Sequence, residues 1–392
     1  MLVLLMYAHG FCMTSTLTSV PFVDLSLIHE PLKAEIQAAI LTVVDKGDFV
    51  LGHALTEFEI AFAKACGVQY GVGVACGTDA IALGLQACGI KPGDEVLVPA
   101  NTFIATLIGV LHAGATPILV DCDPHTALID LNHAAQVVTQ KTKAIIPVHL
   151  YGQMVSPHQL FAFAAAHNLI IFEDAAQAHL AERESYGAGS IGLAAAFSFY
   201  PSKNLGCFGD GGMVVTQNEI VAQNLRSLRN YGAPQKYLHT EKGTNSRLDT
   251  LQSAILNVKL PHLNTWNRDR NFAAEKYDAS LLLLRERGII PIENQSADGH
   301  VYHLYVIRVT EECAINRDTL KDKLTEQGIQ VGIHYPIPCH LQPAYQYLGY
   351  KQGDFPQTEK LSQQILSLPM YPGLTTYQIN QVLTAIQSAI GA

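Results

Sequence analysis

The sequence predicts an α/β fold in which a mostly parallel sheet lies between helices. Strand patterns alternate with helical patterns over about 200 residues, which is typical of strands joined by crossover helices. The tail after residue 260 has fewer strands and an amphipathic final helix, which indicates a smaller α+β unit packed on the first. With 392 residues, 48% of them hydrophobic, the chain is long enough to form both units.

The larger unit is expected to begin with two amphipathic helices, at 32–46 and 55–66, the first ended by Gly47. Seven strands should follow and form one mixed, mostly parallel sheet, in which ligands bind beyond the carboxyl ends of the strands. The expected strands are 70–76, 95–99, 116–121, 144–149, 169–173, 195–200 and 212–216. The helices expected between them are 80–88, 102–113, 131–138 and 158–167.

The smaller unit should follow a long helical pattern that Pro261 interrupts. We expect this pattern at 247–284, then a strand at 303–309 and helices at 317–327 and 377–390. The predicted division is a leader at 1–19, a large domain at 20–260 and a small C-terminal α+β domain at 261–392.

The composition argues against several classes of protein. The net charge is −9 and basic residues form no run, so nucleic acid is not an expected partner. The eight cysteines are scattered without a CxxC pair, which favours reduced thiols in the cytoplasm over disulfides or a zinc site. Outside the start of the chain, no apolar run has the length of a membrane span, and we expect no membrane association.

The first residues, MLVLLMYAHGFCM, are apolar but have no basic start and are too short to cross a bilayer. We expect residues 1–19 to be a disordered or wrongly included leader, with Met13 as a candidate start of the native protein. A signal peptide is the alternative.

Lys203 lies in a polar turn between two apolar strands, within FSFYPSKNLGCFGDGGMVV. Its aromatic neighbours would desolvate the amine, lower its pKa and leave a neutral nucleophile that can attack an aldehyde. For this lysine alone, an ordinary solvated turn is the alternative interpretation.

A candidate phosphate site lies between a strand and a helix at Gly77, Thr78 and Asp79. Free amides and the positive end of the dipole at a helix start bind phosphate. Ser198 would add a hydroxyl to the same group. A simple helix cap is the alternative.

Asp174 follows the apolar strand 169–173, where a carboxylate is poorly solvated and needs a cationic or hydrogen-bonding partner. A protonated pyridine nitrogen would serve, and the carboxylate would keep that nitrogen protonated. Capping of the following helix is the alternative.

Together these features resemble pyridoxal phosphate enzymes of the aspartate-aminotransferase-like, type I fold. The chain resembles the DegT/DnrJ-type sugar-nucleotide aminotransferase family, and the resemblance extends over nearly its whole length. The motifs that carry it, in chain order, are CGTDAIALGL, GDEVLVPANTFIAT, KAIIPVHLYGQ, FEDAAQAH, FSFYPSKNLGCFGDGG, SLRNYG, GTNSRLDTLQSAIL and HYPIPCHLQPAY.

The resemblance implies roles for individual residues around the cofactor. Lys203 would form the Schiff base with the cofactor, and Asp174 would pair with its ring nitrogen. Gln177 would bind the ring hydroxyl, and Phe103 would stack on the ring. Four residues would hold the phosphate: Gly77, Thr78, Asp79 and Ser198.

Other residues are implied at the edges of the site. Asn245 would reach the phosphate from the neighbouring subunit, which implies a homodimer with shared active sites. His334, Tyr335 and His340 fall in the segment that lies near the nucleotide-sugar in relatives. This chain departs from the family at Cys76, where Asn is frequent, and at Leu180, where Gly is frequent; both departures affect the expected shape of the sugar pocket.

The activity implied by the resemblance is amino transfer from L-glutamate to a nucleotide-linked keto-sugar, with pyridoxal 5′-phosphate and pyridoxamine phosphate as the two cofactor forms. The segment HYPIPCHLQPAY is most similar to enzymes that aminate C3 of dTDP-3-oxo-6-deoxyhexoses, and amination at C4 is the alternative. Two further alternatives are a pyridoxamine-dependent dehydratase, whose relatives have histidine in place of the lysine, and a non-catalytic regulator.

Overall fold

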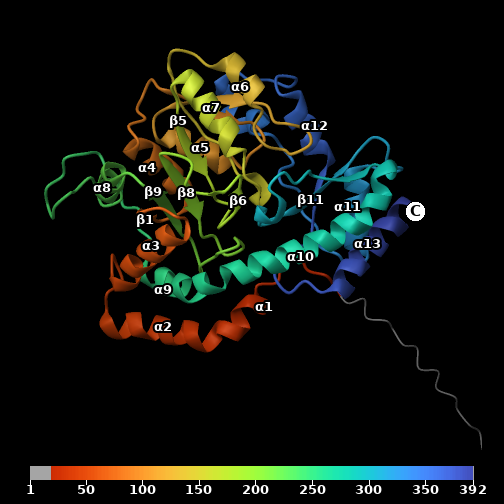
Figure 1. Cartoon of the computed structure of the whole chain (residues 1–392), viewed down its shortest axis with the longest axis horizontal. Coiled ribbons are helices and arrows are strands. Elements are labelled where there is room, and N and C mark those ends of the chain that lie inside the picture. The colour runs from red at the N-terminus through yellow and green to blue at the C-terminus, as the bar shows by residue number, and fades with distance from the viewer. Residues whose placement is uncertain (1–18, 392) are drawn as a thin grey trace, which may run out of the picture.

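A computed structural model describes residues 19–391, which fold around a seven-stranded sheet (Figure 1). Apart from Ser19, the expected leader lies outside the described residues. The strand order is β1-β9-β8-β5-β4-β2-β3. The strands are β1 (Tyr70–Val74), β2 (Glu95–Pro99), β3 (Thr116–Val120), β4 (Thr142–Ile145), β5 (Ile170–Asp174), β8 (Ala194–Ser198) and β9 (Gly212–Thr216).

The predicted mostly parallel, mixed sheet is confirmed. From β3 across to β8 all neighbouring strands are parallel, whereas β9 runs antiparallel to both β8 and β1. Because β8 and β9 are antiparallel neighbours, with Ser198 opposite Gly212, the loop between them stays at one edge of the sheet. Lys203 lies in this loop and is therefore held beside the carboxyl ends of β5 and β8.

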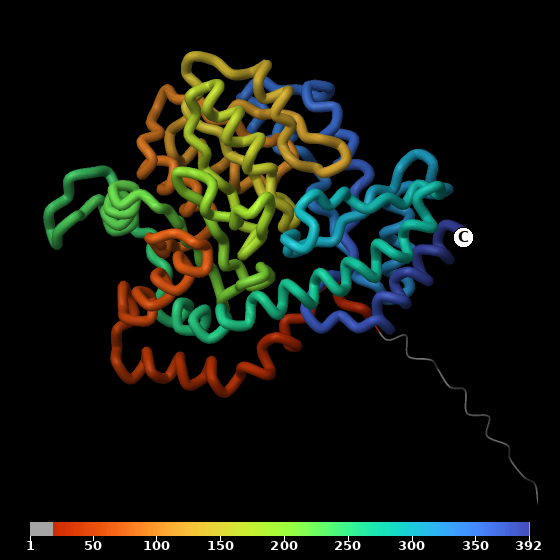
Figure 2. Tube along the Cα trace, viewed as in Figure 1, coloured from red at the N-terminus to blue at the C-terminus, as the bar shows by residue number. Residues whose placement is uncertain are grey.

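Helices pack around the large sheet, and one long helix, α10 (Leu263–Leu281), runs from these helices to the smaller unit (Figures 1 and 2). The helices associated with the large unit are α1 (Ser26–His29), α2 (Lys33–Lys46), α3 (His53–Ala65), α4 (Gly77–Ala87), α5 (Ile104–His112), α6 (Leu131–Val137), α7 (Pro157–His167), α8 (Glu219–Leu228) and α9 (Thr250–Lys259).

The smaller unit contains a three-stranded antiparallel sheet, β10-β11-β12. Its strands are β10 (Ile289–Pro291), β11 (Tyr305–Val309) and β12 (Ile365–Leu368), and its helices are α11 (Arg317–Glu326), α12 (Pro356–Gln364) and α13 (Thr376–Ile390). A two-residue pair, β6 (Glu182–Arg183) and β7 (Tyr186–Gly187), completes the strands.

Two hydrophobic cores are present, one for each sheet. The chain passes between them more than once: Val20 packs in the core of the small sheet, whereas Val301 and Phe355 pack in the core of the large sheet. The domain boundary at residue 260 stays a prediction.

Within residues 19–391, no helix combines the length and apolar character needed to cross a membrane. The seven cysteines in this range are all free. Over the same range, no group of three or more His, Cys, Asp or Glu side chains is arranged to hold a metal ion.

A buried ion pair closes the outer edge of β1. Glu59 in α3 accepts a hydrogen bond from the Gly73 amide at 2.8 Å and pairs with Arg229, which follows α8. Arg229 in turn donates to the Gly73 carbonyl at 2.8 Å. Both side chains are about nine-tenths buried, with 9% and 10% of their surface exposed, so neither charge is well solvated without the other. The pair thus satisfies edge-strand groups that would otherwise be unpaired.

We expect Glu59→Gln to lower the free energy of unfolding by about 3–5 kcal/mol, because it leaves the buried Arg229 charge uncompensated. Urea denaturation followed by the fluorescence of the single tryptophan, Trp266, measures this. The control is Glu30→Gln, which breaks an exposed pair with Lys33 and should change stability by less than about 1 kcal/mol. Equal effects of the two substitutions would contradict the role assigned to the buried pair.

Candidate active site

A pocket of about 390 Å³ lies at the carboxyl ends of β5 and β8, against the starts of α4 and α5. Residues of the C-terminal part, at 303 and 334–335, form its other wall. Nine of the twelve predicted site residues line it: Gly77, Thr78, Phe103, Asp174, Gln177, Ser198, Lys203, His334 and Tyr335.

Asp174 ends β5 with its side chain directed into the pocket and only 5% of the residue exposed. Its Oδ2 accepts a hydrogen bond from the Thr106 hydroxyl at 2.7 Å, and its Oδ1 accepts one from the Ala176 amide at 3.1 Å. Burial raises the pKa of Asp174, while these two hydrogen bonds and the charge of Lys203 oppose the shift. A cation placed against this carboxylate would stabilise its ionised form.

Lys203 approaches the same pocket from the loop between β8 and β9. Its backbone amide donates to the Tyr200 carbonyl at 2.9 Å, which tightens the loop at this point. Burial lowers the pKa of Lys203 to about 8, and the charge of Asp174 opposes this shift. The amine can therefore lose its proton near neutral pH, as a nucleophile or proton carrier requires.

The start of α4 forms the candidate phosphate cradle. Cys76 occupies the cap position without a side-chain cap hydrogen bond, and its thiol, which faces the amides of Thr78 and Asp79, is a weak acceptor that an anion can replace. A Cβ atom on Gly77 would lie 2.7 Å from the Ser198 Cβ, which means that only glycine allows this close approach. Thr78 and Ser198 add hydroxyls to the pocket, so the residues present fit an anionic group.

Phe103 and Gln177 form the walls around the expected ring. Phe103 is half exposed, and its ring centre lies 5.2 Å from that of Tyr335. The Gln177 Oε1 accepts from the Tyr151 amide at 2.7 Å, which fixes the orientation of the side-chain amide. Its Nε2 then donates to the Tyr335 hydroxyl at 3.1 Å and has a second hydrogen left for an acceptor in the pocket.

Three predicted site residues do not line the pocket. The Asp79 carboxylate accepts from the Ser246 hydroxyl at 2.6 Å, so only its backbone amide belongs to the helix start. Asn245 is exposed outside the pocket, and its expected contact from the neighbouring subunit stays a prediction. His340 is buried, its Nε2 lies 3.0 Å from the Glu359 carboxylate, and its ring packs on Phe355. The structure thus does not bring His340 to the pocket.

Among the lining residues that the sequence interpretation missed, Thr106 and His303 bear most on the two central groups. Thr106 lies in the first turn of α5, three residues after Phe103. Its place beside the residue expected to stack on the ring could have identified this hydroxyl as part of the site. His303 comes just before β11, 100 residues after Lys203, and no local pattern connects the two. Thr106 donates a hydrogen bond to Asp174, and the His303 Nδ1 lies 3.1 Å from the Oδ1 of Asn204, the residue after Lys203.

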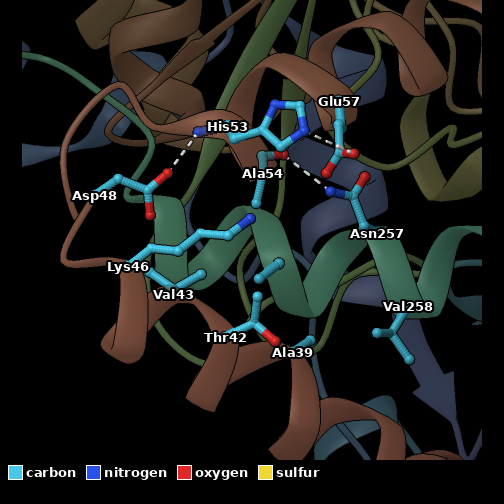
Figure 3. A pocket seen from close by; sticks show the side chains of 11 residues that line it. Ala39, Thr42, Val43, Lys46, Asp48, His53, Ala54, Glu57, Asn257 and Val258 are labelled. Atoms are coloured by element: carbon cyan, nitrogen blue, oxygen red, sulfur yellow. Dashed lines mark hydrogen bonds and ion pairs between the residues drawn. The ribbon is translucent and has the colours of Figure 1, made fainter.

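A second hollow, of about 270 Å³, lies between α2, α3 and α9 (Figure 3). Polar groups in its wall bind one another: the His53 amide donates to Asp48 at 2.9 Å, and Asn257 donates to the Ala54 carbonyl at 2.9 Å. The His53 ring lies 3.3 Å from Glu57 at the exposed surface. We therefore assign the candidate site to the pocket that holds Asp174 and Lys203.

Comparison with known proteins agrees with this geometry. The pattern of the DegT/DnrJ/EryC1/StrS aminotransferase family matches residues 30–387. The chain is 44% identical over 370 residues to the pleiotropic regulatory protein of Geobacillus stearothermophilus, covering 94% of this chain and 98% of that protein. It is also 44% identical over 368 residues to the dTDP-3-amino-3,4,6-trideoxy-α-D-glucose transaminase of Streptomyces venezuelae, covering 94% and 95%.

Among solved structures, the crystal structure of S. venezuelae DesV in complex with a ketimine intermediate is similar, with a TM-score of 0.91 and 43% identity. The similarity covers 95% of this chain and 99% of DesV. The range matched by the family pattern, 30–387, includes both sheets and every residue that lines the pocket.

We expect the Lys203 amine of the cofactor-free protein to react with an acylating reagent with a pH midpoint near its pKa of about 8. Asp174→Asn should move this midpoint to lower pH, because the carboxylate that stabilises the ammonium form is gone. Mass spectrometry of the labelled peptide measures the reaction. Asp210→Asn is the control, since Asp210 lines the pocket without contributing to the Lys203 shift. A midpoint that rises, or stays unchanged, in Asp174→Asn would refute the coupling.

Proposed function

This chain belongs to the DegT/DnrJ/EryC1/StrS aminotransferase family, and on this premise we propose that it moves an amino group from L-glutamate to C3 of a dTDP-linked 3-oxo-6-deoxyhexose. Its cofactor is pyridoxal 5′-phosphate. The observation that carries the proposal is the meeting of buried Asp174 and partly buried Lys203 in one pocket beside the start of α4. The name of the S. venezuelae relative supports the choice of sugar and of carbon atom.

The residues present fit this cofactor. The first amides of α4, with the hydroxyls of Thr78 and Ser198, would hold its phosphate. Asp174 would keep a proton on the ring nitrogen, and the free hydrogen of Gln177 Nε2 would bind the ring oxygen. When bound, the cofactor supplies an aldehyde that takes up the amino group and a protonated ring that accepts electrons from the reacting carbon.

Lys203 has two tasks in this scheme. Its neutral amine would hold the cofactor through the aldehyde carbon before substrate arrives and, once free, would move a proton at the substrate carbon that bears the amine. A pKa of about 8 suits both tasks, because the amine can gain and lose a proton near neutral pH. Since one lysine serves both the amino donor and the amino acceptor, we expect ping-pong kinetics.

The wall formed by His334 and Tyr335 would bind the nucleotide-sugar. Tyr335 is fixed by the hydrogen bond from Gln177, and the His334 Nδ1 lies 2.9 Å from the Ser367 hydroxyl. A catalytic lysine argues against a dehydratase of the histidine-containing kind. The lysine and the buried carboxylate also favour catalysis over a purely regulatory role, although one relative is named a regulatory protein. Free thiols are consistent with a cytoplasmic enzyme.

The experiment that tests the function supplies L-glutamate and a panel of 3-keto and 4-keto nucleotide sugars, and follows the amino-sugar product. We expect turnover of the dTDP-linked 3-keto-6-deoxyhexose. Lys203→Ala should abolish turnover and the visible absorbance of the lysine-bound cofactor, while the protein still folds. Asp174→Asn should bind the cofactor but lose at least about 100-fold in rate, as expected for a lost acid–base partner. Normal turnover by Lys203→Ala would refute the assignment, and turnover of 4-keto sugars alone would correct the carbon atom.

We further propose a homodimer in which Asn245 completes the phosphate site of the neighbouring subunit. The basis is that Asn245 is exposed and outside its own pocket, while the adjacent Ser246 holds its loop against Asp79. An exposed amide on a loop fixed in this way is available to a second copy of the chain.

Mixing Lys203→Ala and Asn245→Ala subunits tests this arrangement. In a mixed dimer one site would have both defects and the other site neither, so activity should return to about half that of the wild type per mixed dimer. The measurement is activity of purified heterodimers, with each single mutant dimer as control. If verified heterodimers show no recovery, each chain builds its phosphate site alone.

A further inference from the structure

His303 is a pocket residue that the proposed mechanism has not used. It lies just before β11 in the C-terminal part and lines the pocket from the side opposite the large sheet. Its Nδ1 is 3.1 Å from the Oδ1 of Asn204, the residue that follows Lys203 in the chain. His303 is thus attached directly to the segment that carries the catalytic amine.

The hydrogen bonds of Asn204 determine which nitrogen of His303 carries a proton. Asn204 Nδ2 donates to the Val301 carbonyl at 2.8 Å and to Asn267 Oδ1 at 3.0 Å. A carbonyl can only accept, so the amide cannot be turned around, and Asn204 Oδ1 must face His303. Since this oxygen also only accepts, His303 Nδ1 has to be the donor and carries the proton.

His303 is also held in its neutral form. Burial keeps its pKa well below the usual value, and the positive charges of Lys203 and Arg270 lower it further, with smaller contributions from His179 and His334. A neutral imidazole with a proton on Nδ1 has a free electron pair on Nε2. Among residues 19–391, no protein donor binds this atom, which opens onto the pocket.

The other two histidines near Lys203 do not offer the same group. His179 is completely buried, and its Nε2 donates to the Ser198 carbonyl at 2.9 Å. His334 Nδ1 faces the Ser367 hydroxyl, which can donate or accept, so its proton position is not determined. His303 alone of the three has a fixed proton and an acceptor directed at the pocket.

We propose that His303 is a positioning residue for Lys203, whose ammonium group, not bonded to Nε2 in this structure, turns toward that atom and donates a hydrogen bond to it. The bond involves no transfer of the proton to His303. The bond orients the amine whenever Lys203 is protonated. Asn204 keeps the His303 Nε2 free as the acceptor, because it binds the proton on Nδ1. The inference deepens the proposed function and rests on Lys203 acting as the proton carrier there.

Two substitutions separate this role from simple packing. A glutamine side chain reaches about as far as Nε2 and retains an acceptor, whereas an asparagine reaches only to Nδ1 and retains the donor to Asn204. In cofactor-free protein, His303→Asn should lower the Lys203 labelling midpoint by about one to two pH units, because an acceptor for the ammonium is lost. His303→Gln should leave the midpoint close to that of the wild type.

With cofactor and substrates, we expect His303→Asn to lose about 10- to 100-fold in kcat and His303→Gln to stay within about threefold. Any other pattern of the two variants, including equal shifts or none, overturns the proposal. If His303→Asn does not fold, ¹⁵N resonances of the histidines in wild-type cofactor-free protein decide the matter, with His303→Gln used for assignment. An unprotonated Nε2 at neutral pH supports the proposal, and a protonated Nε2 refutes it.

The midpoint and the resonances are read without cofactor or sugar. If they behave as expected and no keto-sugar is aminated, the proposed function fails and the link between His303 and Lys203 stands. If amination occurs and the midpoint does not move in His303→Asn, only the inference about His303 fails.

Discussion

The site depends on two groups of opposite charge that face one pocket, the buried Asp174 and the partly buried Lys203. Burial alone would make both neutral, and it raises the pKa of the carboxyl and lowers that of the amine to about 8. The charge of each group opposes the pKa shift that burial causes in the other. A ligand that gives a cation to Asp174 and a carbonyl carbon to Lys203 satisfies both groups at once, which is the chemistry of a protonated pyridine aldehyde.

The neighbouring carboxylate, Glu173, shows by contrast why Asp174 is the one we propose as functional. Side chains alternate along β5, so the two carboxylates point to opposite faces of the sheet. Glu173 is fully buried and accepts from the amides of Gly189, Ile191 and Gly192 at 2.8–3.0 Å and from His149 at 3.0 Å. Four protein donors thus satisfy Glu173, whereas Asp174 accepts only two hydrogen bonds and faces the pocket. The first carboxylate supports the strand end, and the second is left for a ligand.

Much of this arrangement could be predicted because it follows the large sheet. Buried parallel strands are short apolar runs, and their carboxyl ends meet at one edge, so Asp174, Ser198 and the start of α4 had to lie together. The strands β10 and β12 were not predicted, because segments of three or four residues have no measurable periodicity. The inclusion of His303 and the absence of His340 from the pocket depend on how the two cores pack, which no local pattern contains.

That packing is what completes the pocket. The Tyr151 hydroxyl donates to the His334 carbonyl at 2.7 Å, Gln177 donates to Tyr335, and Asn204 donates to Val301. In each bond a residue at position 151–204 holds a residue of the C-terminal part. A shift of the C-terminal part by about 1 Å would lengthen all three beyond hydrogen-bond distance. The two walls of the pocket therefore cannot be positioned independently, and a change that moves the backbone at 334–335 should also alter the surroundings of Lys203.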